Sequence, residues 1–236
     1  MERILFVLCL SGFICLLPLT FYFIGLAYLN SRTRPTRFNG AWDFVGVLFA
    51  LSGFLFLGGP ILLSALDSTW RMLWMKGGLR EFHEAWQPAR IGWMSIWGGY
   101  FFLIVGGASL ILWRRSRLTA IYQVEPHLIA ETLQECIEMT RRTCRVEANS
   151  LHVGPKEAEP GCVVQVDIVE TFCHATLTWN GATPATRREI ELALDGGLYR
   201  IGVVSNPLAN WLFSLAAILF FMMLFCLVFM GTILFS

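Results

Sequence analysis

Two cysteines and two histidines in the second half of the chain are the side chains that suggest metal chemistry. They are Cys162, Cys173, His174 and His152. Zinc sites of this composition use short spacings such as C-x-x-C or H-x-x-x-H, and neither spacing occurs in the chain. Cys173 and His174 are neighbours on a predicted strand, so their side chains point to opposite faces and do not meet at one ion. We therefore predict no metal site, and we interpret these cysteines as buried packing residues.

A pair of acids and two glycine pairs are the other groups with a conceivable chemical role. Asp167 and Glu170 are separated by an odd number of positions, which places them on different faces of a strand instead of side by side for acid–base catalysis. The glycine pairs at residues 77–78 and 196–197 lack the lysine and the strand-to-helix context of a phosphate-binding loop. We assign no catalytic, cofactor-binding or metal-binding residue and predict no cofactor.

Most of the chain that surrounds these residues is too apolar for a soluble protein. Of the 236 residues, 56% are hydrophobic and only 15% are charged, which lies outside the usual soluble range. A helix of about 20 apolar residues crosses a bilayer, and four segments of that kind contain no Asp, Glu, Lys, Arg or His. They are residues 4–29, 44–66, 91–113 and 207–236. We predict four transmembrane helices, the first of them too long for the apolar region of a signal peptide.

The absence of ionisable side chains from these four segments limits what the predicted spans can do. Proton relays need acids or histidines in the membrane, voltage sensors need arginines, and haem sites need histidine pairs. None of these residues is present in the segments. The sequence therefore argues against proton relay, voltage sensing and haem-based electron transfer through the spans; only a path lined by backbone carbonyls stays open.

Small residues mark two helix faces at which another helix can approach closely. One face belongs to the second segment, which also has an expected kink at residues 58–60, and the other to the third segment, where glycine recurs every seven residues. The residues are Gly46, Ala50 and Gly53 in the second segment and Gly92, Gly99 and Gly106 in the third. We predict that the two segments pack against each other through these faces. The alternative is that the glycines only reflect the usual composition of membrane helices.

The loop between the second and third segments, residues 67–90, is rich in tryptophan. Its large apolar side chains recur at helical spacing opposite charged residues, which predicts two short helices in the membrane interface, the second ended by Pro88. The interfacial residues are Trp70, Trp74, Phe82 and Trp86. The loop is either a docking surface for another membrane subunit or an ordinary re-entry loop anchored by tryptophan, and we favour the second interpretation.

Residues 114–206 have the mixed pattern of a small soluble domain. Helices are predicted at residues 126–142, opened by a proline, and at 186–197, where Thr186 and Glu189 form a capping box and a glycine pair ends the helix. Strands are predicted at residues 119–124, 144–153, 162–170, 171–179 and 199–204. The order β-α-β-β-β-α-β resembles the ferredoxin-like pattern. The predicted fold class is thus an all-α membrane region, residues 1–113 and 207–236, with an inserted α+β domain at 114–206.

Arginines beside the predicted spans indicate on which side of the membrane the domain lies. Four spans place both termini and the 67–90 loop on one side, and the 30–43 loop and the soluble domain on the other. The domain side carries six arginines close to the membrane, against five basic residues spread over a longer stretch on the opposite side. The six are Arg32, Arg34, Arg37, Arg114, Arg115 and Arg117. Because positive charge favours the cytoplasmic side, we predict a cytoplasmic domain with both termini outside.

These observations lead to three hypotheses of different classes. The first is a non-catalytic subunit or anchor of a larger membrane assembly, held in the lipid bilayer, whose soluble domain binds a protein partner or a second copy of the chain. The second is a membrane sensor or regulator that binds a small ligand in residues 118–206. The third is a membrane enzyme that uses His152, Cys162 or His174. A net charge of +1 and the lack of a basic-aromatic tract give no indication of nucleic-acid binding.

Overall fold

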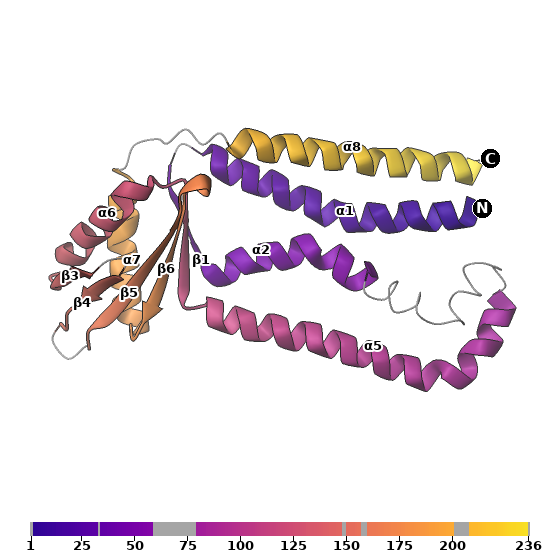
Figure 1. Cartoon of the computed structure of the whole chain (residues 1–236), viewed down its shortest axis with the longest axis horizontal. Coiled ribbons are helices and arrows are strands. Elements are labelled where there is room, and N and C mark those ends of the chain that lie inside the picture. The colour runs from indigo at the N-terminus through magenta and orange to yellow at the C-terminus, as the bar shows by residue number, and fades with distance from the viewer. Residues whose placement is uncertain are drawn as a thin grey trace. The chain divides into compact units, whose positions relative to one another are not determined.

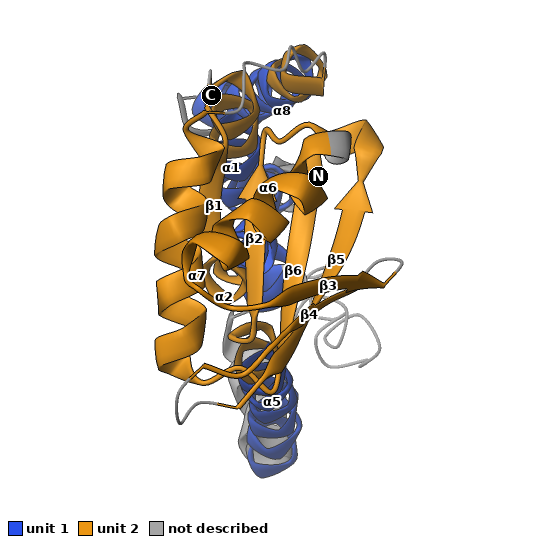
Figure 2. Ribbon diagram, turned by 90° about the vertical axis from the view of Figure 1, so that its left-hand side faces the viewer, with its two compact units in different colours: residues 1–24, 46–111, 214–236 blue, residues 25–45, 112–213 orange. Residues whose placement is uncertain are grey.

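The computed structural model of the chain contains two compact units. Unit 1 comprises residues 1–24, 46–111 and 214–236, and unit 2 comprises residues 25–45 and 112–213 (Figure 2). The structure describes residues 2–32, 34–58, 79–147, 150–156, 160–200 and 208–235.

Unit 1 is built from four long apolar helices, each of which continues at one end into unit 2. They are α1 (Glu2–Ser31), α2 (Gly40–Gly53) with the π-helix η1 (Phe54–Gly58), α5 (Leu79–Arg115) and α8 (Leu208–Phe235) (Figure 1). The stretches with the length and hydropathy of a membrane span are Leu8–Ser31, Gly40–Leu57, Ile91–Arg115 and Leu208–Ile233. By length and composition, the four predicted spans are confirmed, as expected for an integral membrane protein.

The tryptophan-rich loop is described only in part. Trp70 and Trp74 belong to residues 59–78, which lie outside the described residues, as do the side chains of Phe82 and Trp86, so the interfacial role of these four residues stays a prediction. Residues 79–90 form the first turns of α5, which runs through the position where Pro88 was expected to end a helix. A proline removes one backbone hydrogen bond and can bend a helix without ending it. Figure 1 shows such a bend in the N-terminal part of α5.

The small-residue face of α2 lies against α1. A Cβ atom added to Gly53 would lie 2.5 Å from the carbonyl oxygen of Ile14 and 2.6 Å from the Cα of Cys15, and one added to Gly46 would lie 3.3 Å from the ring of Tyr22. The two glycines thus lie where α1 approaches α2 closely. The partner differs from the prediction, since α1 occupies the place that was expected for α5.

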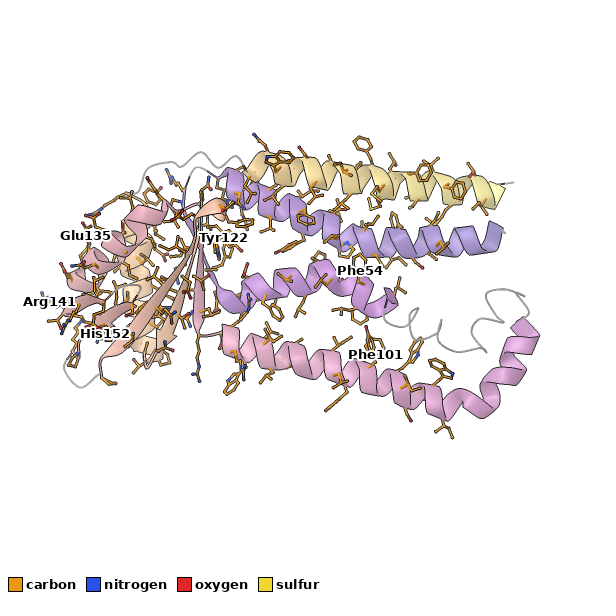
Figure 3. The ribbon with its side chains drawn as sticks, viewed as in Figure 1. Phe54, Phe101, Tyr122, Glu135, Arg141 and His152 are labelled. Atoms are coloured by element: carbon orange, nitrogen blue, oxygen red, sulfur yellow. The ribbon has the colours of Figure 1, made fainter. Side chains whose placement is uncertain are left out.

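Helix α2 meets α5 at its π-helical turn and not at glycine. A π-helix breaks the regular i→i+4 ladder and leaves carbonyl groups available to other donors. The hydroxyl of Tyr100 donates to the carbonyl oxygen of Leu55 at 2.8 Å. The ring centroid of Phe56 lies 5.9 Å from that of Phe101, which Figure 3 shows on α5. The expected contact between the two segments therefore exists, but aromatic side chains make it.

Unit 2 is built on a six-stranded antiparallel sheet with the strand order β1-β2-β6-β5-β4-β3. The strands are β1 (Thr36–Asn39), β2 (Leu118–Tyr122), β3 (Cys144–Glu147), β4 (Ser150–Val153), β5 (Cys162–Val169) and β6 (His174–Asn180). Helices α6 (Pro126–Met139) and α7 (Pro184–Leu198) cover one face of the sheet (Figure 2). Alternate strand residues point toward these helices and form the core, which includes Ile121, Leu177, Leu133 and Ile190.

The α+β character of this region was predicted, but its strands differ from the prediction in three places. The segment 144–153 is the hairpin β3–β4 instead of one strand. The last strand begins at His174, because a short 3-10 helix, η2 (Glu170–Phe172), and the left-handed Cys173, with φ 46°, close the β5–β6 hairpin. Tyr199 and Arg200 form a turn, and the rest of the predicted strand at 199–204 lies outside the described residues.

Strand β1 comes from the segment between the first two membrane helices, which was predicted to be a loop. It pairs with β2, so that Thr36 lies opposite Tyr122 and Asn39 opposite Thr119. Four residues are too few to show a strand pattern, and their partner lies far along the chain. The described order is therefore β-β-α-β-β-β-β-α, which differs from the predicted β-α-β-β-β-α-β.

Helix α7 begins two residues before the predicted position, and the residues at its N-terminus explain why. Its N-cap is Thr183, whose Oγ1 accepts a hydrogen bond from the backbone N–H of Thr186 at 3.1 Å, and Pro184 follows at the first helical position. The glycine pair expected to end the helix lies inside it. A Cβ atom on Gly197 would lie 2.6 Å from the Sγ of Cys136 on α6, whereas one on Gly196 would have no described neighbour within 4 Å.

This difference between adjacent glycines gives a matched test of α6–α7 packing. We expect Gly197→Ala to lower the free energy of unfolding by about 1–3 kcal/mol, because the added methyl group overpacks a buried contact. Gly196→Ala should raise the free energy of unfolding by up to about 1 kcal/mol through helix propensity alone. Denaturant unfolding of the purified protein measures both values, and equal effects of the two substitutions would contradict the packing described here.

Glu189 on α7 joins the helix to two other segments. Its Oε2 lies 3.2 Å from Nη2 of Arg142, which is buried, and its Oε1 lies 2.6 Å from Nζ of Lys156. The hydrogen bond from Lys156, followed by that from Arg142, lowers the pKa of Glu189 from its ordinary value of 4.5. The carboxylate therefore stabilises the fold while it is ionised.

We expect Glu189→Gln to reduce stability at pH 7 by about 1–2 kcal/mol, because Arg142 keeps its charge in a buried position. The carboxylate has a lowered pKa in the folded state, so its contribution is complete above pH 4.5 and disappears as the pH falls through the folded pKa. Melting temperatures of the two proteins between pH 7 and pH 3 should therefore converge at the acid end. A gap that stays constant with pH would show that the charge of Glu189 has no such role.

Candidate functional site

The cysteines and histidines that were considered for metal chemistry do not form a site. Cys162 is buried on β5 opposite Val153 of β4, whereas the neighbouring His152 is exposed on the other face of the sheet. His174 lies against Tyr122, far from His152 (Figure 3). Burial raises the pKa of the Cys162 thiol, so this group is protonated at neutral pH and is a weak nucleophile. Among the described residues, no three His, Cys, Asp or Glu side chains are grouped to hold a metal ion.

The two acids considered for catalysis are also apart in the fold. Asp167 lies on β5, and Glu170 opens the turn that follows it; both are exposed. All the cysteines are free thiols, and Cys173, which was interpreted as a buried packing residue, is only half-buried in the turn before β6. Ala175, Leu177 and Trp179, from the predicted strand at 171–179, do lie in the core.

Two hollows of unit 2, both lined by arginine, are the most distinctive polar feature of the described structure. The Trp179 pocket, of about 850 Å³, lies among β1, the end of β6 and the first turns of α7. The Tyr199 pocket, of about 670 Å³, lies between the residues that follow α1 and the end of α7. The arginines are Arg37, Arg117, Arg187 and Arg188 in the first pocket and Arg32, Arg34 and Arg37 in the second. Each pocket contains one carboxylate, Glu191 in the first and Asp195 in the second.

Glu191 is the centre of the hydrogen bonds between the pockets. Its Oε2 accepts from Nη1 of Arg37 at 2.6 Å, and its Oε1 accepts from Oγ1 of Thr119 at 2.6 Å and from Nε of Arg187 at 2.8 Å. The Glu191 side chain is only 13% exposed, and a buried carboxylate is tolerated when charged donors surround it. This carboxylate therefore joins β1, β2 and α7.

Arg37 forms the wall that the two pockets share. Its Nε and Nη2 donate to the two oxygens of Asp195 at 2.7 and 2.8 Å, and its Nη1 donates to Glu191. This two-pronged geometry suits the planar guanidinium group, which a lysine could not replace. The hydrogen bond with Asp195 raises the pKa of Arg37 further above its ordinary value. Arg37 is thus neutralised by two acids and fixes strand β1 to α7.

Thr119 and Arg187 complete the network on the inner side of the Trp179 pocket. The hydroxyl of Thr119 donates to Glu191 and accepts from Nε1 of Trp179 at 2.8 Å and from Nη2 of Arg187 at 3.0 Å, so its hydrogen-bonding capacity is filled. Arg187 also donates to the carbonyl oxygens of Ser116, which follows α5, and of Leu118, the first residue of β2. Arg187 is therefore a structural residue that holds the chain where it leaves α5.

We expect Thr119→Val to lower the free energy of unfolding by about 1–3 kcal/mol, because it keeps the shape of the side chain but leaves Trp179 without its acceptor and removes one of the three donors to Glu191. Thr119→Ser retains the hydroxyl and is the matched control, with an expected loss below that of the valine variant. Thermal unfolding of the two purified variants measures the difference. A valine variant as stable as the serine variant would mean that the hydroxyl contributes nothing.

The remaining arginines of the two pockets have no acidic partner among the described residues. Arg32 and Arg34 lie over tyrosine rings, with Cζ to ring-centroid distances of 5.0 Å to Tyr28 and 4.1 Å to Tyr199, and Arg117 lies 5.8 Å from the ring of Trp113. Arg188 lines the Trp179 pocket and is exposed. Within the described part of the chain, none of these four forms an ion pair, so both pockets carry excess positive charge.

Chain connectivity places both pockets close to helix ends that belong to the same unit. Arg32 directly follows α1, Arg37 precedes the start of α2 by three residues, and Arg117 follows the end of α5 by two. Each residue advances the chain by at most about 3.6 Å, so these side chains originate within roughly 10 Å of the ends of the apolar helices. The excess charge therefore lies close to the ends of helices that have the length and hydropathy of membrane spans.

A second contact fixes the ends of α2 and α5 to the sheet within unit 2. The hydroxyl of Tyr122 on β2 donates to Oδ1 of Asp43, and Oδ2 of Asp43 lies 3.6 Å from Nη1 of Arg115. The ring of His174 lies against Tyr122, with a centroid distance of 4.6 Å, and burial lowers its pKa, so the imidazole is neutral at pH 7. Asp43 in the first turn of α2 and Arg115 in the last turn of α5 also match the helix dipoles.

Sequence reasoning used the arginines near the spans only to assign sidedness, and it missed the pockets. One signal was available, because Arg187, Glu191 and Asp195 follow each other at intervals of four residues on one face of α7. Their partner Arg37 comes from a strand that no local pattern revealed. Comparisons of the chain with models of protein families, with curated proteins and with solved structures find no match.

Proposed function

We propose that the chain is a non-catalytic subunit of a larger membrane assembly, in which the α+β domain holds the ends of the helices and binds a partner. The observation that carries this proposal is the contrast between the glycines of α2 and those of α5. Gly46 and Gly53 are used within the chain, because α1 packs closely against them. The glycines of α5 meet no described atom within 4 Å of an added Cβ. They are Gly92, Gly98, Gly99, Gly106 and Gly107.

Glycine in the middle of a helix is destabilising relative to alanine, by about 1 kcal/mol at each position in water. In membranes it recurs at helix interfaces, because it lets two backbones approach and gain van der Waals contact. The chain uses one set of glycines in this way and leaves the α5 set open. A helix from another copy or another protein would fill this face, which supports the assembly role over that of an isolated anchor.

The soluble domain supports the same proposal through its construction. Arg37 fixes the segment between α1 and α2 to α7. Asp43, at the start of α2, contacts both Tyr122 of β2 and Arg115 at the end of α5, and so connects these two helix ends to the sheet. A domain tied to three helix ends is suited to hold those helices in a fixed register for a partner. From the arginine bias of the domain side we further propose that the domain is cytoplasmic and that both termini are outside.

A role as a membrane sensor is the second candidate, and the two arginine-lined pockets are the observation that favours it. Both pockets share Arg37, which holds β1 between α1 and α2. A small anion bound in either pocket would act next to the helix ends. A ligand-dependent rise in the melting temperature of the full-length protein, without any co-purifying protein, would favour the sensor over the subunit.

The assembly proposal is tested by extraction in a mild detergent and native mass measurement. The wild-type protein should run as a complex with a second copy or a partner protein. The double substitution Gly99→Leu and Gly106→Leu should release the chain as a monomer, because leucine side chains would hold the neighbouring backbone away from α5. Within the described part of the chain an added Cβ meets no atom within 4 Å at either position, so the substitution should leave the melting temperature of the monomer within a few degrees.

The control is Ala217→Leu, which also introduces a leucine, at an exposed position of α8. This variant should retain the complex. A wild-type protein that is a lone monomer in detergent and in nanodiscs would count against the proposal, and so would a complex that survives the double substitution on α5 unchanged.

A further inference from the structure

We propose that the Trp179 pocket binds the phosphate group of an anionic lipid headgroup. Four guanidinium groups line this pocket against the single carboxylate of Glu191. Guanidinium groups present paired N–H donors that match the oxygens of a phosphate, and they are less strongly hydrated than ammonium groups. The pocket, of about 850 Å³, is large enough for a headgroup with its phosphate.

The four arginines divide into two that build the pocket and two that are available to a ligand. Arg37 and Arg187 are engaged with Glu191, and their donors neutralise its charge, so this carboxylate does not repel an incoming anion. Arg117 and Arg188 line the same pocket, are exposed, and form no ion pair within the described residues. The pocket therefore has a wall of paired charges and, within the described residues, two arginines without an acidic partner.

The apolar part of the lining indicates a lipid in preference to a free phosphate compound. Ala182, Pro184 and Leu192 contribute apolar surface to the pocket, and Leu192 is 61% exposed. A lipid presents both a phosphate and an adjoining glycerol and acyl region, so it can use both parts of this lining. A soluble phosphate would contact only the arginines.

The position of the pocket in the chain puts it next to a source of anionic lipid. Arg117 follows the last residue of α5 by two positions, and Asn39, which also lines the pocket, directly precedes α2. Both helices have the length and hydropathy of membrane spans. Basic residues at this level lie among the headgroups, where anionic lipids concentrate. The pocket belongs wholly to unit 2 and is separate from the glycine face of α5, so this inference does not rest on the assembly proposal.

The test uses full-length protein that has been purified in a non-ionic detergent and stripped of lipid. Native mass measurements with added phosphatidylglycerol or phosphatidylcholine give the affinity of each lipid. We expect tighter binding of phosphatidylglycerol to the wild type, and a loss of about 25-fold in the double variant Arg117→Gln and Arg188→Gln, since each basic residue near an anionic lipid contributes about a factor of five.

A second double variant, which removes the same number of arginines, distinguishes binding in the pocket from nonspecific attraction to positive surface charge. Arg114 lies in the last turn of α5, next to Arg115, and lines neither pocket. Arg145 is an exposed residue of β3. The variant Arg114→Gln and Arg145→Gln should therefore bind phosphatidylglycerol within about twofold of the wild type. A second pocket variant, Leu192→Glu, changes an exposed side chain and should weaken phosphatidylglycerol binding through charge repulsion while the melting temperature stays the same.

Three results would overturn the proposal. Equal loss of binding in the two double variants would show a diffuse charge effect and no pocket. Equal affinity of the wild type for the two lipids would show that the phosphatidylglycerol headgroup is not recognised. Inorganic phosphate that binds the wild type and is lost in the pocket variants, together with no preference for phosphatidylglycerol, would assign the pocket to a soluble phosphate ligand and reject the lipid.

Discussion

The carboxylate of Glu191, which is almost withdrawn from water, is the group on which the arrangement of unit 2 depends. A buried negative charge is tolerated only while donors surround it, and its three donors come from three segments: Arg37 between the first two helices, Thr119 on β2, and Arg187 on α7. Arg187 in turn holds the carbonyl groups that follow α5. The charge of Glu191 therefore helps to fix the chain at the end of α1, the start of α2 and the end of α5, together with the wall that the two pockets share.

The features that sequence reasoning predicted are those with a local signal. The four spans appear as long runs without ionisable residues, and α6 appears as a helical repeat of apolar residues opened by Pro126. The buried face of β6, with Ala175, Leu177 and Trp179, follows from strict alternation. Each of these signals lies within one element, because the hydrophobic pattern of a helix or strand records which face is buried.

The features that were missed depend on partners that are distant in the sequence. Nothing near Arg37 indicates that its strand pairs with β2 or that its guanidinium meets Asp195 on α7. In the same way, the glycine face of α2 shows that a helix approaches, but the choice of α1 over α5 depends on the arrangement of all the helices. The Trp179 pocket combines both difficulties, since β1, β6 and α7 each contribute only a few of its lining residues.

The pairing of β1 with β2 also has a consequence for how the protein is made. β1 lies before α2 and β2 lies after α5, so the two strands can meet only if the chain between them crosses the bilayer an even number of times. A chain in which one of these two helices fails to insert would leave the strands in different compartments, with Glu191 and Asp195 lacking Arg37. For helices that span a bilayer, a complete sheet is therefore consistent only with insertion of both helices or of neither.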